Sequence, residues 1–284
     1  MKKRAIALLL ALSLTLCFVS CDNPKPASTP TNTPMPTPTE TPWALCSRNT
    51  GSSKTLRGNC LIINIFLSDE ESSFTEKEKK KYFDSLFTAL NYLTKEAEKY
   101  NQTISFTYDT EDTNLDYTVE YILPQSAYGT KKEWDYRQLI ENLSAQYNID
   151  SVIQKYNSDN VFFMIVINKE GRSYAISHNT QKDTAYFNEY ATIYSYDGLS
   201  TNPEKGWVCS GNSTTISHEI LHLFGAIDLY DLESETLALA KEYFPMDIML
   251  IDSPMLHKLT ISDLDAYLIG WKDTLDERYK IFLR

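Results

Sequence analysis

The sequence predicts an α/β (α+β) fold, with helices packed against a β-sheet. Residues 61–67 and 161–167 are almost entirely apolar and have the length and composition of strands buried on both faces. Residues 75–100 and 135–156 carry apolar side chains at helical spacing, the second of them with a break near Asn148. Because strands and helices alternate along the chain, we expect a layered domain.

Shorter segments with alternating apolar and polar residues add strands to this sheet. We expect residues 186–194 to form an edge strand beside the helix that begins near residue 214. An exposed edge strand can bind an extended peptide through backbone hydrogen bonds. The predicted shorter strands are 104–110, 117–123, 174–177 and 185–196.

Residues 1–21 have the pattern of a bacterial export signal. Lys2, Lys3 and Arg4 precede an apolar run of 15 residues, 5–19, which is shorter than the roughly 20 residues of a membrane-spanning helix. The following Phe-Val-Ser-Cys resembles a lipobox, in which Cys21 becomes the lipidated first residue of the mature chain. We therefore expect a protein anchored by lipid to the outer face of a bacterial cell membrane, or otherwise a secreted one.

The domain organisation follows from a change in composition. Residues 22–43 contain seven of the 11 prolines, interleaved with threonine, and predict a disordered linker because they cannot form a core. Residues 44–284 are long enough for one domain with a substantial core. The net charge of −11 argues against nucleic acid as a ligand, since phosphate binding needs a basic surface.

The most informative segment is H-E-x-x-H-x-x-G-x-x-D, residues 218–228. His218 and His222 are four residues apart, so both imidazoles extend from one face of a helix and can hold one Zn²⁺. Glu219 is rotated by about 100° from His218 and can instead accept the proton of a water bound to the metal. Gly225 suits a left-handed helix end, after which the chain can return Asp228 to the ion.

The third ligand is less constrained by spacing than the histidines. Asp228 is the expected ligand and would leave one coordination position open, as catalytic zinc sites require. If Asp228 only caps the next turn, a later acid would complete the site. The residues that remain as alternatives are Asp231, Glu233, Glu235 and Asp247.

This motif resembles that of the metzincin metallopeptidases, in particular the snapalysin-like branch, in which Asp is the third ligand. Residues 244–249 resemble the Met-containing turn of that family, with Met249 as the methionine beneath the metal. Residues 259–271 resemble the helix and Gly-Trp that end the catalytic domain of immune-inhibitor-A-like peptidases. The resemblance implies a twisted mixed sheet, an active-site helix and a small C-terminal subdomain, with residues 44–225 above the cleft and 226–284 below it.

The implied function is a zinc endopeptidase that hydrolyses extracellular proteins. The sequence leaves the oligomeric state open, with a monomer as the expectation. One zinc ion, bound by His218, His222 and Asp228, would activate a water molecule, and Glu219 would act as general base. Two alternatives stay open: a gluzincin-like peptidase with a downstream Glu ligand, and a catalytically inactive cell-surface binding protein. The sequence leaves calcium binding and the preferred substrate open.

The cysteines suggest one disulfide outside the cytoplasm. Cys21 would carry lipid, which leaves Cys46, Cys60 and Cys209 in the domain. A Cys46–Cys60 bond would stabilise the fold by about 3 kcal/mol in the loop-entropy estimate. Because three is an odd number, one thiol remains, and Cys209 is an alternative partner for either of the others.

Overall fold

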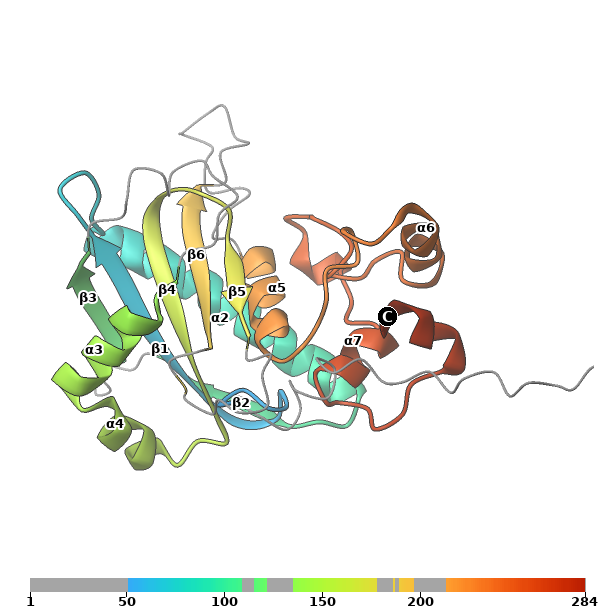
Figure 1. The fold of residues 1–284 in the computed structure, drawn as a ribbon, viewed down its shortest axis with the longest axis horizontal. Coiled ribbons are helices and arrows are strands. Elements are labelled where there is room, and N and C mark those ends of the chain that lie inside the picture. The colour runs from blue at the N-terminus through green and yellow to red at the C-terminus, as the bar shows by residue number, and fades with distance from the viewer. Residues whose placement is uncertain are drawn as a thin grey trace, which may run out of the picture. The chain divides into compact units, whose positions relative to one another are not determined.

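The computed structural model describes residues 51–108, 115–121, 135–177, 186, 189–196 and 213–283. Within them, six strands form one mixed sheet in the order β2-β1-β4-β6-β5, and β3 pairs with β1 beyond the end of β2 (Figure 1). All pairings are parallel except that of β5 with β6. The strands are β1 (Gly58–Ser68), β2 (Ile104–Thr107), β3 (Asp116–Glu120), β4 (Asn160–Glu170), β5 (Tyr174–Ile176) and β6 (Tyr190–Tyr196).

The two apolar runs form the centre of the sheet, as predicted. Strands β1 and β4 pair in parallel from Cys60 beside Asn160 to Leu67 beside Ile167. Every residue of both strands over this stretch is buried. Burial on both faces explains why these strands lack the alternation of polar and apolar residues that marks a sheet with one wet face.

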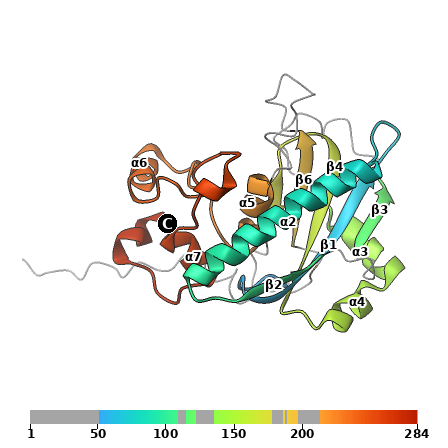
Figure 2. The same cartoon turned by 180° about the vertical axis from the view of Figure 1, so that it is seen from behind.

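Helices cover both faces of the sheet (Figures 1 and 2). Helices α2 (Glu76–Lys99) and α5 (Ser213–Leu223) share a core with one face of β1, whereas α3 (Arg137–Tyr147) and α4 (Ile149–Tyr156) pack on the other face. Asn148 separates α3 from α4 with a left-handed backbone (φ 50°), which is the predicted break. The layered α/β arrangement expected from the sequence is therefore present.

The C-terminal part of the chain joins the first of these cores. Trp271 donates its indole N–H to the carbonyl of Leu56 at 2.5 Å, and the hydroxyl of Tyr100 donates to the carbonyl of Ile261 at 2.8 Å. The apolar side chains of this part belong to the same buried cluster as those of α2 and α5. Its helical segments are α6 (Ser234–Tyr243), η3 (Leu256–Lys258), α7 (Asp263–Leu268) and η4 (Glu277–Leu283).

The edge of the sheet differs from the prediction. Strand β6, which the sequence analysis placed at the edge, lies between β4 and β5. Tyr190, Ala191 and Ile193 of β6 are all at most 1% exposed, so this strand lies inside the domain. The terminal strand at this end of the described sheet is β5, which is only three residues long.

Several expectations lie outside the described residues. They concern the signal, the Cys21 lipobox, the linker, Cys46 and Cys209. Cys60 is a buried free thiol in β1, and burial raises the pKa of this thiol to about 12. The expected bond between Cys46 and Cys60 stays a prediction, because Cys46 is not among the described residues. Among the described helices, none combines the length and the apolar character that crossing a bilayer would need.

Candidate metal centre

Helix α5 presents the two histidines because its other sides are occupied by packing. Ile216, Ile220, Leu221 and Leu223 are fully buried in the core shared with α2. The side chains of His218 and His222 remain 14% and 19% exposed. The apolar spacing that predicted the helix thus also decides which face is left for a ligand.

The end of α5 is a Schellman motif, and it turns the chain back toward the histidines. Gly225 has φ 104° and donates its N–H to the carbonyl of His222 at 3.0 Å. The N–H of Ala226 donates to the carbonyl of Leu221 at 3.1 Å. The left-handed glycine predicted from the sequence is therefore confirmed, and Asp228 follows it after two residues.

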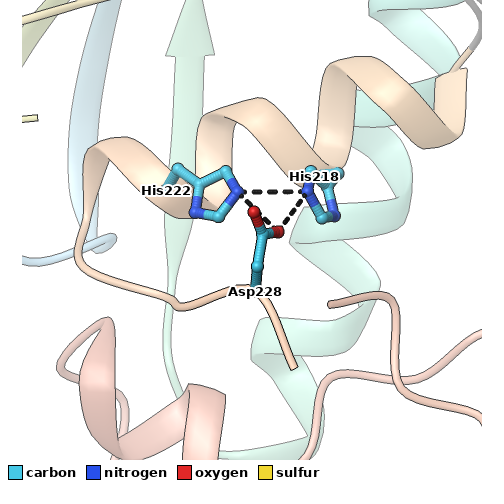
Figure 3. Close-up of side chains that lie close together, drawn as sticks. All are labelled: His218, His222 and Asp228. Carbon is cyan, nitrogen blue, oxygen red and sulfur yellow. Dashed lines mark hydrogen bonds and ion pairs between the residues drawn. The ribbon is translucent and has the colours of Figure 1, made fainter. Parts of the chain in front are cut away.

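His218, His222 and Asp228 converge on one point (Figure 3). The two Nε2 atoms are 3.1 Å apart, and Oδ1 of Asp228 lies 3.0 Å from one and 3.1 Å from the other. Ligands of tetrahedral zinc with bonds of about 2.0–2.1 Å are separated by roughly 3.3 Å. The three atoms therefore already stand close to the spacing that a metal ion requires.

Backbone carbonyls fix the tautomer of both histidines. Nδ1 of His218 lies 3.1 Å from the carbonyl of Ile248, and Nδ1 of His222 lies 2.9 Å from the carbonyl of Ala226. Because a carbonyl only accepts, each Nδ1 carries the hydrogen, which leaves each Nε2 with its lone pair directed at the cluster. Two lone pairs and a carboxylate oxygen at such distances need a cation or a proton between them.

The pKa shifts of His222 and Asp228 agree with this requirement for a cation or a proton. Burial would lower the pKa of His222, but the hydrogen bond to Asp228 and the charges of Glu219 and Asp228 together outweigh it and raise the pKa to about 9. Burial would raise the pKa of Asp228, but its interactions with His218 and His222 hold that pKa well below its usual range. A metal bound between these three groups would compete with a proton for the same place, so metal binding should be accompanied by proton release.

Glu219 is buried beside the cluster, with 5% of its surface exposed. Burial raises the pKa of its carboxyl group, and the charges of His218 and His222 oppose that shift. Its Oε2 has no hydrogen-bond partner among the described residues. A buried carboxylate oxygen without a donor is costly, so this side chain is suited to accept a proton from a small molecule held at the cluster.

The turn that contains Met249 lies directly against the site. Ile248 accepts the hydrogen bond from His218, and Met249 accepts one through its carbonyl from the N–H of Leu229 at 2.9 Å. The Met249 side chain is fully buried. The expected role of Met249 beneath a bound metal stays a prediction.

The alternative third ligands do not join the cluster. Among the described acidic residues, Asp228 is the one grouped with the two histidines. Asp231, Glu233 and Glu235 are exposed, whereas Asp247 is fully buried and accepts from the N–H groups of Met249 and Ser262. Asp228 is therefore the acid that the fold offers to a metal.

Two further residues at the site were missed by the sequence analysis. The ring of Tyr230 lies nearly parallel to that of His218, with centroids 6.1 Å apart, and its hydroxyl receives a hydrogen bond from Arg172 at 3.3 Å. Tyr230 stands two residues after Asp228, but it is one of 19 tyrosines. Nothing in the local sequence distinguishes Arg172.

Comparisons with known proteins do not identify a family for this chain. No protein-family model matches the sequence, and no curated protein matches it. Among solved structures, a chain of a chaperone–substrate complex is 15% identical, with a TM-score of 0.31, over 59% of this chain and 23% of that chain. This chain thus spans less than a quarter of the length of that one, and so low a score carries no argument about function.

Proposed function

We propose that this protein is a zinc-dependent endopeptidase of the metzincin type. The observation that carries the proposal is the combination of three converging ligand atoms, from His218, His222 and Asp228, with the unpartnered buried carboxylate of Glu219 beside them. A structural zinc site would use four protein ligands and would need no base. Three ligands and a base are what a hydrolytic site needs.

The residues divide the chemistry between them. When bound, zinc supplies Lewis-acid chemistry, which lowers the pKa of a water molecule and polarises the carbonyl under attack. Glu219 accepts the proton of the attacking water and transfers it to the leaving amine. Ile248 and Ala226 keep the histidines in the required tautomer, which fixes the direction of their lone pairs.

The substrate class follows from the edge of the sheet. Strand β5 ends the described sheet and contacts α5, the helix that carries the histidines. An extended peptide can add to such an edge by backbone hydrogen bonds, which would place a peptide bond near the metal centre. The proposed substrates are extracellular proteins, in keeping with the expected lipid anchor at Cys21.

The decisive experiment replaces Glu219 with Gln, which keeps the size of the side chain but removes its basicity. The purified variant should retain about one zinc per chain, as a site with three protein ligands allows. Its kcat on casein or a peptide library should fall by about 10²–10⁴-fold. The exposed Glu235→Gln serves as a control and should change neither quantity.

Two outcomes would overturn the proposal. Undiminished cleavage by zinc-loaded Glu219→Gln would exclude this residue as the base. A wild-type chain that bound no zinc, or that bound zinc and cleaved no peptide, would also contradict the proposal. It would favour the alternative of a non-catalytic cell-surface binding protein.

A further inference from the structure

Arg172 brings a positive charge from the edge of the sheet to the metal centre. It lies in the turn between β4 and β5 and is exposed. Its guanidinium donates to the hydroxyl of Tyr230, two residues beyond Asp228. Because the ring centroid of Tyr230 lies 6.1 Å from that of His218, this contact brings the guanidinium to the side of the cluster without making it a metal ligand, and its charge acts on both Asp228 and Glu219.

The turn that carries Arg172 is closely packed against β6. A Cβ atom on Gly171 would lie only 2.4 Å from Cδ1 of Tyr194, so a larger residue could not occupy this position without displacing the ring. On the other side of Arg172, the hydroxyl of Ser173 accepts the N–H of Tyr194 at 3.2 Å. The residues on both sides of Arg172 thus contact the same tyrosine. These contacts fix the position of the backbone from which the arginine side chain extends.

The position of Arg172 relative to β5 matters for a bound peptide. Arg172 comes two residues before Tyr174, the first residue of β5. A peptide paired with the edge of β5 would pass the turn as it approaches the metal centre. Alternate side chains of an extended peptide point to the same side, so a side chain close to the scissile bond would lie within reach of the guanidinium.

We propose that Arg172 is a specificity-determining residue that binds the carboxylate of an acidic substrate side chain next to the scissile bond. A guanidinium has five N–H donors in a planar fork that matches a carboxylate, and Tyr230 engages one of its nitrogens. Asp228 is directed at the histidines, and Asp231 is exposed, where water screens its charge. The inference rests on the proposed peptidase function.

The test compares peptides that differ at a single position. A peptide cleaved by the zinc-loaded protein is made with Glu, Gln or Lys at each position flanking the scissile bond. The wild type should have a kcat/KM about 10-fold or more higher for Glu than for Gln at one of these positions. Arg172→Glu should reverse this order and favour Lys, while Arg172→Lys should keep part of the preference for Glu.

The control is a charge reversal far from the site. Arg137 of α3 is exposed and lies on the opposite face of the sheet from α5. Arg137→Glu changes the net charge as much as Arg172→Glu does, and it should leave the ratio between Glu and Gln peptides unchanged. If only the overall charge of the protein mattered, both variants would change the ratio of kcat/KM between Glu and Gln peptides to the same extent.

Three results would overturn the inference, and they are distinguishable. If Arg172→Glu slows all three peptides by the same factor, Arg172 only holds Tyr230. If the wild type cleaves peptides with no preference for acid at any position, the specificity role fails and the peptidase function stands. If the zinc-loaded wild type cleaves no peptide, the peptidase function and the inference fail together.

Discussion

Asp228 is the residue whose role the spacing of the motif left most open. Its carboxylate oxygen lies within 3.1 Å of both histidine nitrogens, so its removal would take away one of the three proposed ligands. We expect Asp228→Ala to weaken zinc binding by more than about 100-fold, which exceeds the usual effect of losing a residue that only supports a ligand. Competition with a chromophoric chelator measures the affinity.

Asp231→Ala is the matched control for this prediction. Asp231 is exposed and lies outside the cluster, so its removal should leave the zinc affinity unchanged. If the Asp228 variant bound zinc as tightly as the wild type, the third ligand would have to be another residue, such as the downstream glutamate of a gluzincin-like site.

A pair of buried carboxyl groups lies behind the methionine turn. Asp247 and Asp265 are both fully buried, and each affects the pKa of the other. Asp247 accepts from two backbone N–H groups, whereas neither oxygen of Asp265 has a donor among the described residues. We therefore assign the proton to Asp265, whose pKa is raised well above its usual range, by burial first and then by the charge of Asp247.

This pair predicts a fall in stability with rising pH. Because the folded-state pKa of Asp265 is raised, its contribution is complete below the unfolded pKa of about 4 and is lost as the pH rises toward the folded value. Asp265→Asn cannot ionise and should flatten the dependence between pH 5 and pH 8 in urea unfolding. Asp263 lies in the same helix and its side chain is half-exposed, so Asp263→Asn should keep the wild-type slope. Parallel curves for all three proteins would contradict the assignment.

At the scale of an element, we expect the end of α5 to couple stability to the proposed metal binding. Gly225 has φ 104°, a conformation that costs a residue with a Cβ about 1–2 kcal/mol. We expect Gly225→Ala to lower the free energy of unfolding of the metal-free protein by that amount. It should also weaken zinc binding, because the turn positions Asp228. Gly225→Asn should lose less, since asparagine tolerates left-handed conformations, and an alanine variant as stable as the wild type would argue against the strain.

At the scale of the whole molecule, the part of the chain after Gly225 depends on the sheet that precedes it. Trp271 is 3% exposed, packs near Tyr100 and bonds the carbonyl of Leu56. We expect Trp271→Ala to destabilise the protein by about 3–5 kcal/mol, and Trp271→Phe by less. Because one core spans both parts, tryptophan fluorescence and circular dichroism should show a single unfolding transition. Separate transitions for the two parts would contradict this.

Much of the fold could be predicted because it depends on local patterns. The apolar runs of β1 and β4, the capped helix α2 and the break at Asn148 all follow from neighbouring residues. The position of β6 in the sheet could not be predicted in this way. Its alternating polar and apolar residues are compatible with a strand at the edge or in the interior of a sheet. Only its parallel pairing with β4 and the outward placement of β5 decide the order.

For the site, the sequence by itself determined the helix, the spacing of His218, His222 and Glu219, and the glycine turn that follows. These depend on helical periodicity and on the backbone freedom of one residue, which are local properties. The tertiary structure alone decided that Asp228 and not a later acid faces the histidines, that Ile248 orients His218, and that Arg172 reaches Tyr230. Such contacts join residues that the packing of distant elements brings together, and no local pattern encodes that packing.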